Sequence, residues 1–185
     1  MDIESSHEVD VLVERIAEDL TAGLKVAVGF ECPLFAPVRD DPVLLTSQRL
    51  GEEGRPWSAG AGVAVLGSGI AQSMYILRSL AARAGNAFRI TSTLDVSEFQ
   101  SGHGNLLLWE AFVAKSGKAK THKGDAEAAA RACLGRLTHG RGLSDIADEG
   151  PVFSIIGAVM LASGVSRDLR FLSLPCMVVK VNKPR

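Results

Sequence analysis

Apolar side chains recur at every third or fourth position from Val9 to Leu20, and charged residues fill the positions between them. This spacing predicts an amphipathic helix, which we expect to end near Gly23 because glycine commonly follows the last helical turn. The next stretch, Leu24–Phe30, is a short apolar run rich in valine, typical of a strand buried on both faces. A helix followed by a buried strand favours a parallel α/β layer.

The pattern changes in Cys32–Pro56, where prolines are interspersed among charged residues and predict a long loop. A helix is then expected from Ser58, as its capping residue, to about Ala84. Its first half contains four glycines, each of which costs about 1 kcal/mol of helix propensity relative to alanine. We expect close packing of this helix against a neighbouring element to offset that cost.

The rest of the chain continues the alternation of strands and helices, and no linker divides it, so we expect one domain over residues 1–185. The pattern predicts strands over Phe88–Thr91, Asn105–Ala114 and Cys176–Val181, and helices over Asp125–Leu137 and Pro151–Ser163.

Composition narrows the class of protein. Hydrophobic residues make up 46% of the 185 residues, which excludes a mainly disordered chain. The formal net charge of -1 argues against an obligatory polycation that coats nucleic acid. The acidic and polar start has no signal-peptide character, and the longest apolar runs, Ala59–Ala71 and Pro151–Gly164, fall short of the roughly 20 residues of a membrane span. With three widely spaced cysteines, these features predict a soluble, cytoplasmic protein.

Three acidic residues stand where packing does not readily explain them. Glu31 ends the first predicted strand, Glu110 lies inside an apolar strand, and Asp125 precedes an alanine-rich helix. A carboxylate in an apolar strand is costly unless it is paired, hydrogen-bonded or bound to a metal. Together the three could hold Mg²⁺ or Mn²⁺, which prefer oxygen ligands. The alternatives are an N-cap or first-turn role for Asp125 and an ion pair with lysine or arginine for Glu110.

A second group of candidates surrounds the start of the long predicted helix. Arg55 and Ser58 precede glycine-rich backbone, where free N–H groups and the helix dipole attract anions. The stretch matches neither a P-loop nor a dinucleotide-binding fingerprint, so the signal for phosphate is weak. His122, three residues before Asp125, could contact phosphate or assist a water molecule, or it could be a solvated loop histidine.

Four segments, VAVGFECPLFAP, RPWSAGAG, LLLWEAFVA and HKGDAEAAARA, together resemble a predicted-nuclease family of the ribonuclease H-like superfamily. In that family a strand ending in Asp-x-Pro or Glu-x-Pro precedes an Arg-Pro loop, a later strand carries a glutamate, and an aspartate opens an alanine-rich helix. The resemblance covers roughly Val26 to Val181. It implies an α/β fold with a mixed sheet flanked by helices, and it places Glu31, Glu110 and Asp125 at the positions of metal-binding, catalytic acids.

The chain departs from this family at its start. Members begin with a β-hairpin whose first strand supplies an aspartate, whereas this chain starts at the helix. We therefore expect either a metal-dependent nuclease or phosphodiesterase, its degenerate remnant, or a non-catalytic ligand-binding or assembly protein on the same fold. Without the hairpin, Leu24–Phe30 would lie at an exposed sheet edge, which predicts a homodimer through that edge. A nucleic acid or a nucleotide is the expected ligand.

Overall fold

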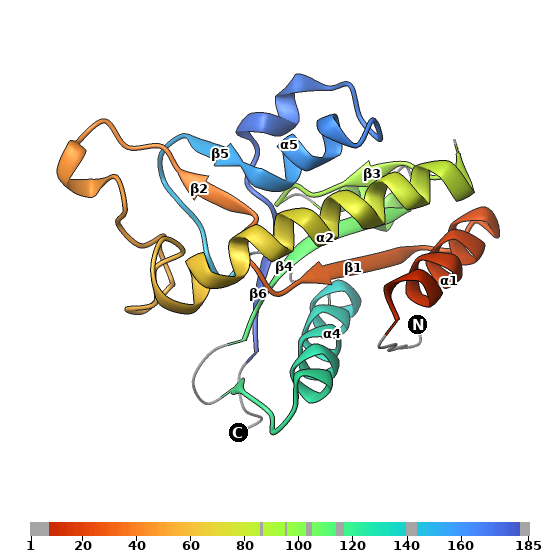
Figure 1. Cartoon of the computed structure of the whole chain (residues 1–185), viewed down its shortest axis with the longest axis horizontal. Coiled ribbons are helices and arrows are strands. Elements are labelled where there is room, and N and C mark those ends of the chain that lie inside the picture. The colour runs from red at the N-terminus through yellow and green to blue at the C-terminus, as the bar shows by residue number, and fades with distance from the viewer. Residues whose placement is uncertain are drawn as a thin grey trace.

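The computed structural model describes residues 8–85, 87–94, 96–102, 105–113, 117–139 and 144–181. Its centre is a four-stranded sheet in which β4 (Leu106–Phe112) lies between its neighbours (Figure 1). One edge of β4 pairs with β1 (Val26–Phe30), and its other edge pairs first with β3 (Ile90–Thr91) and then with β6 (Val178–Lys180). All three pairings are parallel, which confirms the parallel α/β layer.

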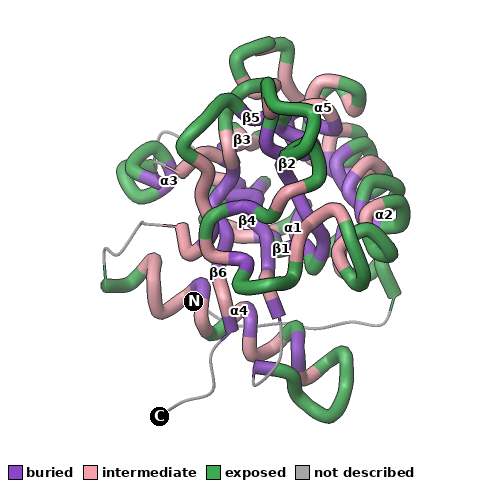
Figure 2. Tube along the Cα trace, turned by 90° about the vertical axis from the view of Figure 1, so that its left-hand side faces the viewer, coloured by how far each residue is buried: buried purple, intermediate pink, exposed green. Residues whose placement is uncertain are grey.

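Helices cover both faces of this sheet. On one face, α1 (Val9–Thr21), α2 (Gly60–Ala84) and α5 (Ile155–Ala162) enclose the larger hydrophobic cluster. On the opposite face, α3 (Ser97–Ser101) and α4 (His122–Thr138) pack over a second cluster. Alternate residues of β4 supply the two clusters, so buried residues follow the sheet through the middle of the molecule (Figure 2). This two-faced burial explains why β4 reads as a continuous apolar run.

The predicted mixed sheet is therefore wrong for the described strands of the main sheet, which run parallel throughout. Antiparallel strand pairing occurs instead in a separate sheet of β2 (Phe35–Pro37) and β5 (Val152–Ser154). Residues 152–154, predicted as the first turn of a helix, form β5 because they pair with the start of the long loop. The loop also contains the 3-10 turn η1 (Pro42–Leu44), and a second such turn, η3 (Leu169–Ser173), follows α5.

Close packing accounts for two of the four glycines in the first half of α2. A Cβ atom on Gly69 would lie 2.2 Å from Cys32 Sγ, and one on Gly62 would lie 2.7 Å from the Trp57 carbonyl oxygen. Gly67, in contrast, has open space around its Cα. The expected capping role of Ser58 is wrong: Ala59 is the N-cap residue, and the Ser58 hydroxyl donates to the Thr46 carbonyl at 2.6 Å.

By length and composition, α2 is one helix in the described chain that could cross a membrane, with 22% of its most apolar window buried. The apolar run Ala59–Ala71, taken alone, falls short of a membrane span, whereas α2 extends to Ala84. Core helices of soluble proteins meet the same criteria, so α2 does not decide between the two environments. Its large buried side chains, Ile76, Leu77 and Leu80, lie in the second half, whereas Val63, in the first half, is 50% exposed.

Candidate functional site

A cavity of about 390 Å³ opens where β1 and β4 end and α2 begins. Ligands commonly bind at the carboxyl ends of parallel strands, and this volume lies within the range of small-molecule sites. The walls combine charged groups with apolar surface. They include Glu31, Glu110, Arg49, Glu52, Arg55, Lys118, Trp57, Val65 and the backbone of residues 59–62.

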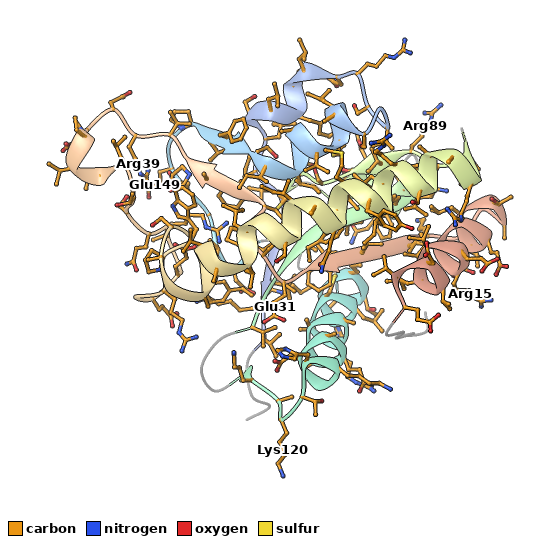
Figure 3. The ribbon with its side chains drawn as sticks, in the orientation of Figure 1. Arg15, Glu31, Arg39, Arg89, Lys120 and Glu149 are labelled. Atoms are coloured by element: carbon orange, nitrogen blue, oxygen red, sulfur yellow. The ribbon has the colours of Figure 1, made fainter. Side chains whose placement is uncertain are left out.

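Glu31 follows β1 directly and lies between the end of that strand and the start of α4 (Figure 3). Partial burial raises the pKa of its carboxyl above the ordinary value of 4.5, and the Asp125 carboxylate raises it further. Lys118 and His122 act in the opposite direction, because a nearby cation favours the charged carboxylate. The structure therefore brings three of the predicted site residues, Glu31, Asp125 and His122, into one neighbourhood.

Asp125 has a structural task in this neighbourhood. Thr121 caps α4 by accepting a hydrogen bond from the Gly124 N–H, and Asp125 lies in the first turn. Its buried carboxylate accepts a hydrogen bond from the Ala119 N–H at 2.6 Å and so holds the segment before the helix. The first-turn alternative for Asp125 is confirmed. One carboxylate oxygen carries this bond, which leaves the metal-binding role of Asp125 a prediction.

Glu110 is engaged in a buried ion pair. Arg49 donates to both of its carboxylate oxygens, at 2.6 and 2.9 Å, and the Leu34 N–H donates at 2.9 Å. Arg49 also donates to Glu52 at 2.8 Å, and its guanidinium lies over the Phe35 ring. Although burial alone would lower the pKa of Arg49, the two carboxylates raise it. The ion-pair alternative for Glu110 is therefore confirmed.

Strand register explains why Glu110 does not join the other two acids. Glu110 is the register partner of Phe30 and lies on the face of β4 that carries Leu106 and Leu108, beneath α2. Glu31, one residue after Phe30, belongs to the opposite face, where α4 lies. Among the described residues, no three histidine, cysteine, aspartate or glutamate side chains form a group that could hold a metal ion. The three predicted acids thus do not converge on one ion here.

Arg55 is exposed at the cavity and, within the described chain, its guanidinium has no hydrogen-bond or ion-pair partner. It lies beside residues 59–62, which begin α2 without a side-chain cap. The first N–H groups of a helix have no intrahelical acceptor and carry partial positive charge. Arg55 and this helix start therefore form a cationic wall, whereas Ser58 has its hydroxyl engaged with Thr46.

Sequence reasoning missed Arg49, Glu52, Trp57 and Lys118 as residues of the site. Arg49 and Glu52 are 1% exposed although they lie in the segment predicted as a long loop. Their opposite charges at i, i+3 spacing could have suggested an ion pair. Because such pairs also form on exposed surfaces, the spacing alone does not indicate burial. The three cysteines are free and buried, and burial raises the pKa of the Cys32 thiol, at the cavity wall, to about 12.

No family model, no curated protein and no solved structure matches this chain significantly.

Proposed function

We propose that this protein binds a small phosphate-bearing ligand of nucleotide size in the cavity at the start of α2, without cleaving it. The observation that carries the proposal is the free cationic wall of Arg55 and the α2 N-terminus in a cavity of about 390 Å³. Trp57 and Val65 add apolar surface on which a base or another planar group can lie. This arrangement supports the non-catalytic, ligand-binding alternative for this α/β fold.

The state of Glu110 supports binding over catalysis. A two-metal phosphodiesterase needs carboxylates that are free to hold ions on both sides of the phosphate. Glu110 accepts three hydrogen bonds, two of them from Arg49, and a metal would have to displace a buried cation. Removing one partner of a buried ion pair is strongly unfavourable. Glu110 is better assigned to fold stability.

A second candidate, a metal-dependent nuclease or phosphodiesterase, is favoured by the proximity of Glu31 and Asp125. The Asp125 carboxylate raises the cost of ionising Glu31, and a divalent cation bound between the two would neutralise their charges. In this reading Mg²⁺ or Mn²⁺ would bind Glu31 and Asp125, and His122 would contact the phosphate. Nucleic acid would then be the substrate.

A cleavage assay and a melting-temperature assay together distinguish the ligand-binding protein from the metal-dependent nuclease. Labelled single-stranded and double-stranded DNA and RNA are incubated with the protein in Mg²⁺, in Mn²⁺ and in EDTA, and melting temperatures are recorded with nucleotides present. We expect no cleavage and a rise in melting temperature that persists in EDTA. Metal-dependent cleavage that is lost in Glu31→Gln would instead establish the second candidate.

A further inference from the structure

The outer edge of β1 has no strand beside it among the described residues. β1 stands at the end of the strand order, with β4 as its neighbour on the inner side. The Val26 N–H donates to the Asn105 carbonyl at 2.8 Å, so Val26, and by alternation Val28 and Phe30, direct their backbone groups toward β4. The N–H and C=O groups of Ala27 and Gly29 therefore point outward.

Both faces of β1 are covered by other elements, so the part of the strand that solvent reaches is its outer edge. The apolar side of α1 packs in the cluster that contains Val28 and Phe30 on one face. On the other face, the Trp109 ring lies where a Gly29 side chain would stand, with ring carbons 2.4–2.8 Å from the position of a Cβ atom. Gly29 is nevertheless exposed. Natural edge strands usually carry proline, a bulge or an inward charge that prevents pairing, and Val26–Phe30 carries neither proline nor charge.

Charges flank the strand symmetrically. Lys25 comes directly before β1 and Glu31 directly after it, each three residues from Val28. If a second β1 lies antiparallel with Val28 opposite Val28, each Lys25 faces Glu31 of the partner subunit. The same register places Ala27 opposite Gly29 of the partner subunit, so the outward-pointing N–H and C=O groups of both strands pair with each other.

We propose that two copies of this chain associate through the edge of β1, in an antiparallel register centred on Val28 and fixed by two Lys25–Glu31 ion pairs. Residues 25, 27, 29 and 31 share one face, and a two-fold axis normal to the sheet keeps that face common to both copies. Lys25 already donates to the Gln100 carbonyl at 2.6 Å, which holds its ammonium on this face with two donors left. The partner's Lys25 thereby reaches Glu31, next to the ligand cavity.

Charge reversal tests the register. Sedimentation equilibrium measures the dimer dissociation constant of the natural chain, of Lys25→Glu, of Glu31→Lys and of the double variant, with circular dichroism as a check of folding. Each single reversal places like charges opposite each other twice, so we expect dissociation to rise roughly tenfold or more. The double variant restores both pairs with opposite polarity and should return the constant to near its natural value.

Cross-linking provides an independent measurement. In the proposed register the two Val28 residues form a non-hydrogen-bonded pair with Cα atoms about 4.5 Å apart, within the range of a disulfide. Val28→Cys should therefore give a covalent dimer on mild oxidation, while Ala27→Cys and the natural chain should not. A monomer at 100 µM or so, reversals without effect, or cross-linking at residue 27 in place of 28 would overturn the proposal. So would a monomer whose β1 edge pairs with a different protein.

Discussion

Arg49 donates hydrogen bonds to both carboxylate oxygens of Glu110, at 2.6 and 2.9 Å, and the two side chains are only 1% and 2% exposed. This pair joins the long loop to the central strand β4. Because Arg49 also binds Glu52, which accepts from the Trp57 N–H, the same contact shapes one wall of the ligand cavity. The fold and the candidate site therefore depend on one buried cation.

Arg49→Met should destabilise the protein by about 3–5 kcal/mol, because it leaves two carboxylates buried without their partner. Urea unfolding monitored by circular dichroism measures the change. Arg15→Met is the matched control, since Arg15 contacts Glu18 and Asp19 on the exposed side of α1 and such pairs contribute about 0–1 kcal/mol. Equal effects of the two substitutions would show that Arg49 does not have this stabilising role.

In the monomer, at concentrations below those at which the chain dimerises through β1, Glu31→Gln should raise the stability of the protein at neutral pH. Burial, and then Asp125, raise the pKa of Glu31 in the folded state, so folding favours the protonated carboxyl. The contribution of Glu31 is thus most favourable below its ordinary pKa of 4.5 and is lost as the pH rises through the folded-state pKa.

The melting temperatures of the natural chain and Glu31→Gln should accordingly converge as the pH falls toward 4.5 and separate toward pH 7. Glu14→Gln, which removes an exposed carboxylate from α1, should show no such divergence. A lower melting temperature for Glu31→Gln at pH 7 would mean that the charged form of Glu31 stabilises the fold.

Two glycines of α2 should respond in opposite directions to alanine. Gly69→Ala directs a methyl group against Cys32 Sγ, and we expect a loss of about 1–3 kcal/mol from overpacking. Gly67→Ala meets open space and should gain about 0.5–1 kcal/mol of helix propensity. Chemical denaturation of both variants gives the comparison, and a loss at position 67 equal to that at 69 would contradict the packing explanation.

The native thiols should be almost unreactive. Burial raises the pKa of Cys32 and Cys133 to about 12 and also raises that of Cys176, and only a thiolate attacks a disulfide reagent. An aromatic disulfide reagent should release little chromophore from the folded chain at pH 8 and three equivalents after addition of guanidinium chloride. Rapid reaction of one thiol before unfolding would show that a cysteine is accessible.

Local sequence patterns predicted the elements whose pattern extends over a full helix or strand. The helix that begins at Val9 and the end of α2 at Ala84 are confirmed because periodicity and glycine punctuation are local properties. The β2–β5 sheet could not be foreseen, since its two short strands pair residues more than 100 positions apart. Gly29 reads as an ordinary strand residue until the Trp109 ring is seen against it.

The residues of the candidate site likewise fall into two groups: those that local patterns predicted, and those whose place depends on tertiary structure. Glu31 and Asp125 were found because each stands at a boundary between predicted elements, and such boundaries gather at one edge of a parallel sheet. Glu110 lies apart from Glu31 and Asp125 because of the strand register. A shift of one residue would move its side chain to the opposite face of the sheet. Its partner, Arg49, lies 61 positions away in a loop, and no local pattern connects the two.

The most direct test of the account is isothermal titration of a nucleoside triphosphate into the natural chain, Arg55→Ala and Arg78→Ala, all in EDTA. Arg78 is an exposed arginine on α2 that does not line the cavity. Loss of one charge-assisted contact to phosphate should weaken binding about ten- to a hundredfold in Arg55→Ala, whereas Arg78→Ala should bind like the natural chain and the nucleotide should be recovered intact. Absence of binding to the natural chain, or equal affinity in Arg55→Ala, would contradict the proposed function.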